Sequence, residues 1–184
     1  MRVITGRYRG RNLGTLSGYD TVRPTEQKVK ESMFSAIQFS VPGARILDLF
    51  AGSGQLGIEA LSRGAREAVF VDSSRDAAGV IRRNLASLGE EVPASVIVGD
   101  CLRYADRNPG KFDIIFLDPP YGEGLAEILA DRLHRMLADG GIAVCETGGD
   151  EEMPESPAGL RLRKRYRHGR TSVWIYDREE DSGT

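Results

Sequence analysis

The chain has 184 residues, a hydrophobic content of 40% and a formal net charge of −2. This length suits one well-buried domain with a small appendage. The negative net charge argues against indiscriminate binding to nucleic acid, and no apolar run approaches the ~20 residues that cross a bilayer. No apolar signal segment opens the chain, so we expect a cytoplasmic protein without membrane contact. The two cysteines and two histidines have unrelated spacings, so no metal site is expected.

Positive charge is nevertheless concentrated near both ends. The first eleven residues carry arginines without any acid, at Arg2, Arg7, Arg9 and Arg11. A second basic segment covers residues 161–170, while acids gather at residues 150–155 and 177–181. Local basic segments on an acidic body suit the binding of a polyanion such as RNA. Solvated hairpins with arginine-rich faces would show the same composition.

Hydrophobic periodicity predicts the elements in chain order. Residues 1–22 are predicted to form a basic β-hairpin extension that contacts RNA, and a helix over residues 26–39 follows with Thr25 as its N-cap. Further helices are predicted over residues 54–63, 74–88, 101–107 and 125–137. Strands are predicted over residues 45–49, 67–71, 94–98, 112–117, 142–146, 160–166 and 172–176. Gly140 and Gly141 are expected to stop the last helix.

Strands that alternate with helices predict βαβ units, whereas the last two strands flank a turn at Gly169 and read as a hairpin. The predicted fold is therefore α/β. It is a Rossmann-like, doubly wound, mostly parallel seven-stranded sheet with a C-terminal antiparallel hairpin. Residues 23–178 form this domain, and residues 179–184 are expected to be a disordered tail.

A glycine-rich loop follows the first predicted strand and opens a helix. Gly52, Gly54 and Gly57 match the fingerprint G-x-G-x-x-G, in which glycines allow a tight turn and close approach of a ligand. Asp72 ends the second strand, where a carboxylate can accept hydrogen bonds from ribose hydroxyls. It could instead interact with the N-terminus of the next helix, which Ser73 or Ser74 would cap. The loop predicts an adenosine-like ligand.

Two further carboxylates bear on the identity of that ligand. Asp48, at the entrance to the loop, would repel a pyrophosphate but favour a cationic sulfonium. Asp100, after the third strand, suits an adenine amino group, although an aspartate after Gly99 is also a common turn former. The position of Asp48 therefore favours S-adenosylmethionine over a dinucleotide.

The fourth predicted strand ends in Asp118, Pro119, Pro120 and Tyr121. In open α/β sheets, ligands bind at the carboxyl ends of the strands. The two prolines lack N–H groups, so this rim offers only acceptors beside a flat aromatic surface. Asp118 and the Pro119 carbonyl could accept both hydrogens of an exocyclic amine, and Tyr121 could stack on its base. Alternatively, the Tyr121 ring could close over the rim as part of the core.

Together these residues resemble the class I S-adenosylmethionine-dependent methyltransferases. The order of residues 6–11, Arg23-Pro24-Thr25, the glycine loop and the Asp-Pro-Pro-Tyr rim resembles more closely the bacterial 16S rRNA guanine-N(2) methyltransferases (the RsmD family). That family often has phenylalanine after the prolines, and Tyr121 keeps the stacking surface.

The resemblance implies methylation of a guanine N(2) amine in 16S rRNA or a small ribosomal subunit, an assembly intermediate included, by a monomer. S-adenosylmethionine would be held by Asp48, Phe50, Ala51, Gly52, Ser53, Gly54, Asp72, Ser73, Asp100 and Cys101. Catalysis would rest on Asp118, Pro119, Pro120 and Tyr121. RNA would be contacted by Arg7, Arg9, Arg11, Arg23 and Thr25.

Three alternatives fit the same architecture. A DNA adenine amino methyltransferase could use the same rim, although the chain has no room for a domain that reads DNA sequence. A nucleoside-binding module without turnover and an NAD-dependent dehydrogenase are the others.

Overall fold

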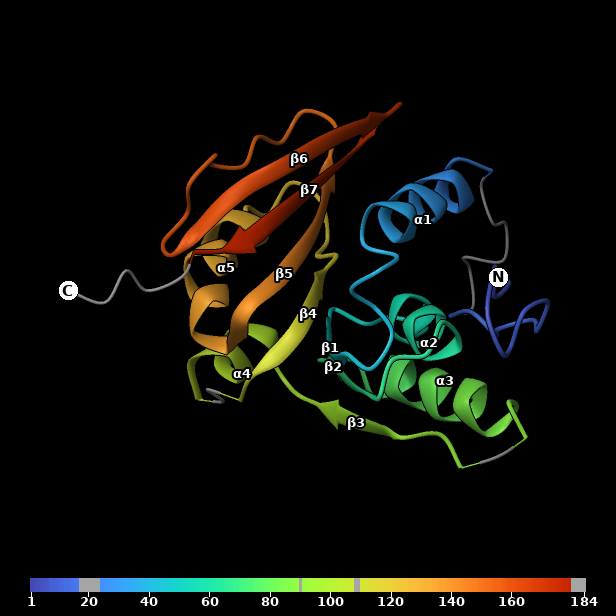
Figure 1. The fold of residues 1–184 in the computed structure, drawn as a ribbon. Coiled ribbons are helices and arrows are strands. Elements are labelled where there is room, and N and C mark those ends of the chain that lie inside the picture. Colours follow the sequence, from blue (N-terminus) through green and yellow to red (C-terminus); the bar gives the residue numbers. More distant parts are fainter. Residues whose placement is uncertain (17–23, 90, 108–109, 180–184) are drawn as a thin grey trace.

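The computed structural model describes residues 1–16, 24–89, 91–107 and 110–179. Within them the chain forms a seven-stranded sheet of order β3-β2-β1-β4-β5-β7-β6, with helices on both faces (Figure 1). The strands are β1 (Arg45–Leu49), β2 (Glu67–Asp72), β3 (Ala94–Val98), β4 (Phe112–Leu117), β5 (Leu137–Gly148), β6 (Leu160–His168) and β7 (Thr171–Arg178). The helices are α1 (Pro24–Ala36), α2 (Gln55–Ser62), α3 (Arg75–Ala86), α4 (Cys101–Arg107) and α5 (Leu125–Met136). In the described part of the chain, no helix is long and apolar enough to cross a membrane.

The pairing of the strands confirms the predicted fold class. Strands β3, β2, β1, β4 and β5 pair in parallel, whereas β5 with β7 and β7 with β6 pair antiparallel. The central strands are almost continuously apolar because both faces of a parallel sheet are covered by helices. Alternate residues of each strand therefore enter two different cores.

One core lies under α1, α2 and α3, and the other lies under α4 and α5. Phe116 and Val144 belong to the first core, together with Val173 and Ile175 of the terminal hairpin. Leu117, Cys145 and Trp174, one position along their strands, belong to the second core. Within one strand, odd-numbered and even-numbered residues therefore lie on opposite faces of the sheet.

The predicted ranges of β5 and α1 differ most from the structure. Strand β5 begins at Leu137 rather than residue 142, because Leu137 already pairs with Phe112 of β4. Gly140 and Gly141 therefore lie inside β5, where Gly140 adopts a φ of 69° beside a register shift in the β4–β5 ladder. Helix α1 runs from Pro24 to Ala36 rather than over residues 26–39. Proline suits the first helical position because its missing N–H would have no helical partner there.

The N-terminal extension packs on α2. Its antiparallel pairing consists of a single bridge, Arg2 with Asn12, with further backbone bonds around it, instead of the predicted pair of strands. Val3, Tyr8 and Leu13 are buried in the first core. Of the predicted tail, only Glu179 is among the described residues, and its amide donates to Gly159 O at 3.0 Å.

Ser62 of α2 joins the extension through both of its oxygens. Its hydroxyl accepts from Tyr8 N at 2.9 Å and donates to Thr5 O at 2.6 Å. Its carbonyl accepts from Arg7 N at 2.7 Å. Gly6 must be glycine in this arrangement, since a Cβ there would lie 1.8 Å from Ser62 O.

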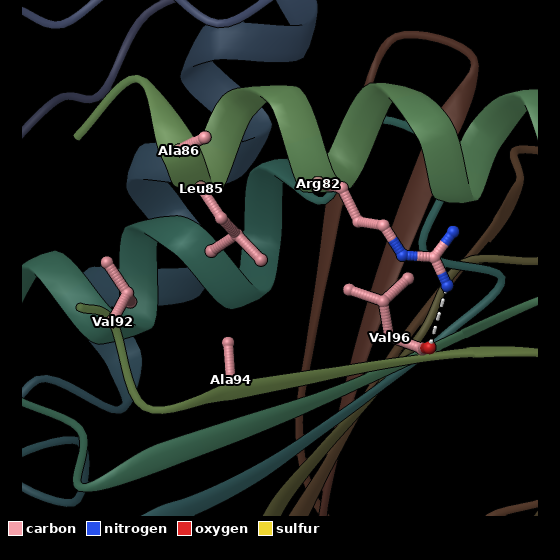
Figure 2. A pocket seen from close by; sticks show the side chains of 6 residues that line it. All are labelled: Arg82, Leu85, Ala86, Val92, Ala94 and Val96. Atoms are coloured by element: carbon pink, nitrogen blue, oxygen red, sulfur yellow. Dashed lines mark hydrogen bonds between the residues drawn. The ribbon is translucent and has the colours of Figure 1, made fainter. Parts of the chain in front are cut away.

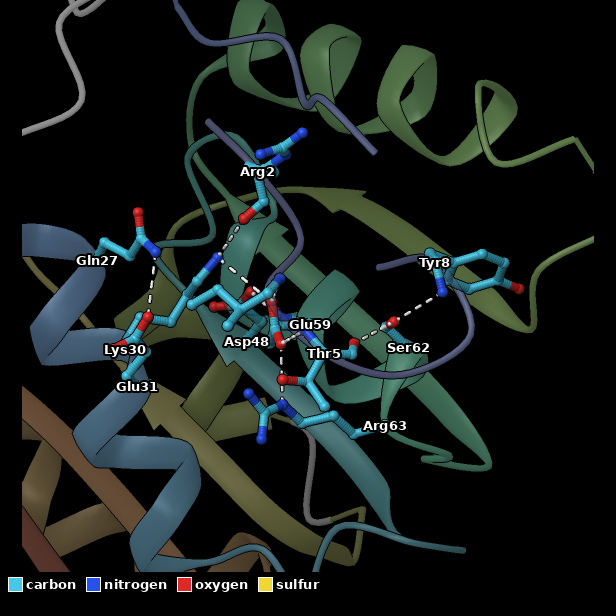
Figure 3. Close-up of polar contacts among 12 residues, drawn as sticks. Arg2, Thr5, Tyr8, Gln27, Lys30, Glu31, Asp48, Glu59, Ser62 and Arg63 are labelled. Carbon is cyan, nitrogen blue, oxygen red and sulfur yellow. Dashed lines mark hydrogen bonds and ion pairs between the residues drawn. The ribbon is translucent and has the colours of Figure 1, made fainter. Parts of the chain in front are cut away.

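Glu59 of α2 is the charged centre of the same contact (Figure 3). Its buried carboxylate accepts from Ile4 N at 2.8 Å and from Thr5 N at 3.0 Å. Arg63 Nε donates to it at 2.9 Å, and Lys30 Nζ lies 3.4 Å away. Burial lowers the pKa of Lys30, and the neighbouring Glu59 opposes that change. The cluster is stable only while all of its charges remain partnered.

We predict that Glu59→Ala lowers the free energy of unfolding by about 3–5 kcal/mol, because it leaves the Lys30 ammonium buried without a counter-charge. Urea denaturation measures the change. The control is Glu127→Ala at an exposed position of α5, where a change under about 1 kcal/mol is expected. Equal midpoints for both variants would contradict the proposed role of Glu59.

Candidate active site

The candidate site lies where the strand order reverses direction. Strands β1 and β4 are parallel neighbours, with Leu49 opposite Leu117 at their carboxyl ends. The chain leaves β1 toward β2 and leaves β4 toward β5, on opposite sides. Asp118 N lies 3.5 Å from Leu49 O in the bond that joins the two strand ends. The glycine loop and the acidic rim therefore meet at one switch point, the place where open α/β sheets bind ligands.

The glycine loop is held against β2 by its own backbone. Phe50 adopts a left-handed φ of 58°, which is uncommon for a residue with a side chain. Ala51 N then donates to Val71 O at 3.1 Å, and Gly52 N donates to Asp72 Oδ2 at 2.8 Å. Backbone held in such a conformation is a common feature of ligand-binding turns.

Glycine is present at the fingerprint positions for different structural reasons. A Cβ on Gly57 would lie 2.3 Å from the Phe70 ring, so this glycine lets α2 pack closely on the sheet. Gly52 has a φ of 53°, and a Cβ there would meet only Phe50 O at 3.9 Å. The space over Gly52 is therefore open to a ligand, whereas the space at Gly57 is already filled by the core.

Asp48 lies beneath the loop rather than at an open entrance, which corrects the expected position of its side chain. It is 1% exposed, and Asp48 Oδ2 accepts from Gly57 N at 2.9 Å. This bond supplies the first turn of α2 with an acceptor that its N-cap, Gly54, lacks. Burial raises the pKa of Asp48 to about 7, Gly57 N opposes this rise, and the nearby Asp72 adds to it.

Asp72 connects the glycine loop to α3. Besides the bond from Gly52 N, its Oδ1 accepts from Ser74 N at 2.8 Å. Ser74 is the N-cap of α3 and accepts from Ala77 N at 3.2 Å, while Ser73 is exposed. The helix-terminal interaction of Asp72 is therefore present. Each carboxylate oxygen can accept more than one hydrogen bond, so the role toward ribose stays a prediction.

Asp100 and Cys101 open α4 beside this loop. The exposed Asp100 accepts from Arg103 N at 2.8 Å, which is the bonding of a turn aspartate. Cys101 is buried and unoxidised, and its Sγ lies 3.8 Å from Val71 O. Burial raises the pKa of Cys101 to about 12, so its thiol is protonated at neutral pH. The pair therefore provides one exposed carboxylate and one apolar wall.

The rim residues differ in exposure. Asp118 is partly buried, Pro119 is buried and Pro120 is exposed. The Tyr121 side chain is 49% exposed, so it does not close over the rim as part of the core. Its hydroxyl donates to Glu146 Oε1 at 2.6 Å. Burial of the hydroxyl and the Glu146 charge raise the pKa of Tyr121 well above its ordinary value, so the phenol stays protonated.

Glu146 and Glu151 are site residues that sequence reasoning missed. Leu117 pairs with Cys145, so Glu146 lies one position further along β5, beside Asp118. Glu151 accepts from Gly122 N at 2.7 Å and from Gly148 N at 2.7 Å, which joins the loop after Tyr121 to the end of β5. Glu146 could have been found, because it is the first charged residue after the buried run of β5.

Asn84 of α3 is a third such residue. It is buried, and its Nδ2 donates to Ser53 O at 2.9 Å and to Gly14 O at 3.0 Å. Its Oδ1 accepts from Gly14 N at 2.7 Å. This amide therefore joins the N-terminal extension directly to the glycine loop. Nothing in the helical pattern around residue 84 distinguished it.

The predicted RNA-contacting residues lie on the extension. Arg7, Arg9 and Arg11 are exposed, and the Arg7 guanidinium lies 5.8 Å from the Tyr8 ring centroid. Arg23 lies outside the described residues, as does the side chain of Thr25.

A separate hollow of about 350 Å³ lies between α3 and the edge strand β3 (Figure 2). Arg82 spans it and donates from Nη2 to Val96 O at 3.2 Å. Its other walls are Leu85, Ala86, Val92 and Ala94. These aliphatic side chains offer no group for acid–base or nucleophilic chemistry.

Comparison with known proteins agrees with the geometry. The family model described as "Conserved hypothetical protein 95" matches residues 1–177. YlbH of Bacillus subtilis is 41% identical over 181 residues, which cover 96% of this chain and 98% of YlbH. Ribosomal RNA small subunit methyltransferase D of Escherichia coli is 32% identical over 181 residues, which cover 97% and 90%. The solved structure of yhhF from Escherichia coli has a TM-score of 0.84 at 32% identity and covers 98% of this chain and 99% of that chain.

The switch-point site and the Rossmann-like sheet thus define a methyltransferase of the α/β class. The chain belongs to the family described as conserved hypothetical protein 95. The expected resemblance to the RsmD methyltransferases is confirmed by the Escherichia coli relative.

We predict that the free energy of unfolding falls as pH rises between 3.8, the ordinary pKa of an aspartate, and about 7, the pKa of Asp48 in the folded protein. Over this interval the native state retains a proton that the unfolded state has released, so acid favours the native state. Asp48→Asn removes this titration. Urea unfolding from pH 4.5 to pH 7.5 should show a steeper decline for the wild type than for the variant. Parallel pH profiles would rule out a raised pKa at Asp48.

We predict that Tyr121→Phe lowers kcat/KM for methyl transfer about 10- to 100-fold, because the ring loses a charge-assisted hydrogen bond worth about 1.5–3 kcal/mol. Glu146→Gln should cause a similar loss. In the Tyr121→Phe background, Glu146→Gln should cause no further loss, because Glu146 positions the ring through the hydroxyl. Multiplicative losses in the double variant would show that Glu146 acts independently of Tyr121.

Proposed function

We propose that this protein transfers the methyl group of S-adenosylmethionine to the N(2) amine of a guanine in 16S rRNA. The observation that carries the proposal is the junction of the glycine loop with the Asp118 rim at one switch point. Relatives in Escherichia coli and Haemophilus influenzae that bear the name ribosomal RNA small subunit methyltransferase D support the choice of substrate.

The residues around the glycine loop suit S-adenosylmethionine. The open space over Gly52 and its left-handed backbone leave room for a ligand against the main chain. Asp72 can accept from ribose hydroxyls, and Asp100 can accept from an adenine amine. Phe50 and Cys101 would provide apolar contact to the adenine ring. When bound, the cofactor supplies an electrophilic methyl group. Its positive sulfonium would favour the ionised form of Asp48, whose pKa burial raises to about 7.

The rim would activate the acceptor amine. The lone pair of an exocyclic guanine amine is delocalised into the ring, so the free amine is a poor nucleophile. Asp118 and the Pro119 carbonyl would accept its two N–H bonds, which directs the nitrogen lone pair away from the ring. Positive charge then develops on the nitrogen as it takes the methyl group, and Asp118 stabilises this charge and accepts the proton that is lost. Holding the amine and the methyl donor close together in a reactive orientation supplies much of the rate enhancement.

Tyr121 would hold the base itself. An amine inside a stacked helix is out of reach, so the target nucleotide must be unstacked or flipped into the site. The exposed Tyr121 ring, fixed by Glu146, offers a flat face for that base. Stacking on such a ring contributes about 1–3 kcal/mol per base.

The N-terminal extension would bind the surrounding RNA. Arg7, Arg9 and Arg11 are exposed, and with Arg23 and Thr25 they would contact phosphates, which gives an affinity that falls steeply with salt. Asn84 joins this extension to the glycine loop, so the RNA-binding and cofactor-binding parts share one rigid framework. We further propose that the protein acts as a monomer in the cytoplasm, on 16S rRNA or on a small subunit during its assembly.

The same rim would serve the amine of adenine, so a DNA adenine methyltransferase is the second candidate by chemistry alone. The relatives named for small-subunit rRNA favour the guanine assignment. A dehydrogenase would need a group that donates a proton to a carbonyl, whereas the rim offers acceptors.

The test is transfer of label from tritiated S-adenosylmethionine to 16S rRNA transcribed in vitro, to isolated 30S subunits and to DNA. We expect label in RNA, recovered as N(2)-methylguanosine by nucleoside mass spectrometry. Asp118→Asn and Asp118→Ala should lower kcat about 10²–10³-fold, because a fixed carboxylate no longer meets the developing charge.

Cofactor affinity, measured by calorimetry, should be unchanged in both Asp118 variants. Asp106→Asn is the matched control, because that carboxylate pairs with Arg132 on the surface of α4 and α5. Label in adenine of DNA would favour the second candidate. An equal loss of cofactor affinity would place Asp118 in the cofactor pocket instead.

A further inference from the structure

A groove of about 440 Å³ runs between α1 and β6. Its walls come from two elements that are far apart in the sequence. They are Lys28, Glu31, Ser32 and Ser35 of α1, and Tyr166 and His168 of β6. Figure 1 shows the two elements that form its walls, helix α1 and strand β6 of the terminal hairpin. We propose that this groove binds a base of single-stranded rRNA next to the target nucleotide. This inference rests on the proposed function and adds a second RNA contact to it.

The basic residues of β6 divide between its two faces. Arg165 stacks 4.0 Å over the Trp174 ring, and Glu152 accepts two bonds of 2.7 Å from its guanidinium. Arg163 pairs with Asp177, and Arg167 lies 3.9 Å from Asp150. The acidic residues noted in the sequence thus neutralise these three arginines. Three of the six basic side chains in residues 161–170 are therefore ion-paired.

Lys164 and Tyr166 are on the face opposite to Arg165 and Arg167. They pair with Ile175 and Val173 of β7, which belong to the core under α1. Residues directly opposite on neighbouring strands point to the same face of a sheet. Lys164 Nζ lies 4.7 Å from the Tyr166 ring centroid, and no acid pairs with Lys164 among the described residues. Lys164 is exposed and Tyr166 is partly buried against the core, so part of each side chain can meet a ligand on the α1 side of β6.

This face continues to the candidate active site. Val173 is opposite Tyr166 on one side and opposite Glu146 on the other. Tyr166 is therefore two strands away from Glu146, about 10 Å at the usual spacing of a sheet. Glu146 accepts the hydroxyl hydrogen of Tyr121 at the rim. A strand of RNA with its target base at Tyr121 could place a neighbouring base in the groove.

The chemistry of the groove suits a nucleobase. The Tyr166 and His168 rings are nearly parallel, at 19° with centroids 6.5 Å apart, and both line the groove, where a base could stack on them. His168 Nε2 is buried without a hydrogen-bond partner among the described residues, and such a group is satisfied by a ligand or by water.

The α1 wall adds both hydrogen-bond donors and hydrogen-bond acceptors. Ser32 and Ser35 provide hydroxyls, and Lys28 can meet a phosphate. Glu31, held by Gln27 Nε2 at 3.1 Å, can accept from a base amine (Figure 3). Aromatic faces beside a cation recognise unstacked bases, whereas base-paired RNA hides those faces. The occupant is therefore a single-stranded segment.

The test compares the two faces of β6 in RNA binding. Tyr166→Leu retains bulk against the core but removes the aromatic face, and Tyr166→Phe retains the face. The controls are Arg165→Ala and Arg167→Ala, on the opposite side of the same strand. Affinity for a fluorescent 16S rRNA fragment that contains the methylated guanine is measured by anisotropy, and KM and kcat are measured with 30S subunits.

We expect Tyr166→Leu and His168→Ala to weaken RNA binding and raise KM for 30S subunits about 10-fold or more, in keeping with the loss of one base stack. Tyr166→Phe should bind as the wild type does. Cofactor affinity should stay within error in all variants, and the melting temperature of each variant separates a loss of RNA binding from a folding defect. The arginine variants should change RNA affinity less than 3-fold.

Wild-type RNA affinity in both Tyr166→Leu and His168→Ala would overturn the proposal, as would a larger loss in the arginine variants. If binding to the RNA fragment is unchanged but KM for 30S subunits rises, the groove meets a ribosomal protein and the RNA assignment is wrong. The proposed function has its own test, and it is wrong if the wild-type protein forms no N(2)-methylguanosine. If Tyr166→Leu methylates RNA with an unchanged KM, the proposed RNA contact in the groove is wrong and the proposed function still holds.

Discussion

The parallel pairing of β1 with β4 is the constraint on which the rest of the site depends. It sets Leu49 opposite Leu117, so the glycine loop and the Asp118 rim leave the sheet side by side. The chain leaves β1 toward β2 and leaves β4 toward β5, on opposite sides of this pair, and the crevice opens between the two connections. The two halves of the proposed reaction, methyl donor and amine acceptor, would therefore meet at one edge of the sheet.

Carboxylates hold this crevice in shape before any ligand arrives. Asp48 binds the first turn of α2, Asp72 joins the glycine loop to α3, and Glu151 joins the loop after Tyr121 to β5. Each accepts backbone N–H groups that would otherwise be unpaired at a turn or a helix start. Binding energy is then available for the ligand rather than for ordering the loops.

Charge on this protein has to be considered face by face. The arginines of β6 look like a basic patch in the sequence, yet Arg163, Arg165 and Arg167 pair with acids from the same two charged clusters. The extension differs, because Arg9 and Arg11 are exposed on a segment anchored through its backbone to Glu59 and Ser62. This division explains how an acidic chain can still present local surfaces to RNA.

The sequence by itself determined the order of strands and helices, the glycine loop and the acceptor rim, because hydrophobic period and local residue chemistry express these directly. It placed Asp48 at an open entrance and ended the last helix at the Gly140 pair, since burial and strand pairing depend on distant neighbours. Only the tertiary structure joined Tyr121 to Glu146, 25 residues away, and Asn84 to Gly14, 70 residues away. Such contacts follow from strand register and helix packing, which no local pattern encodes.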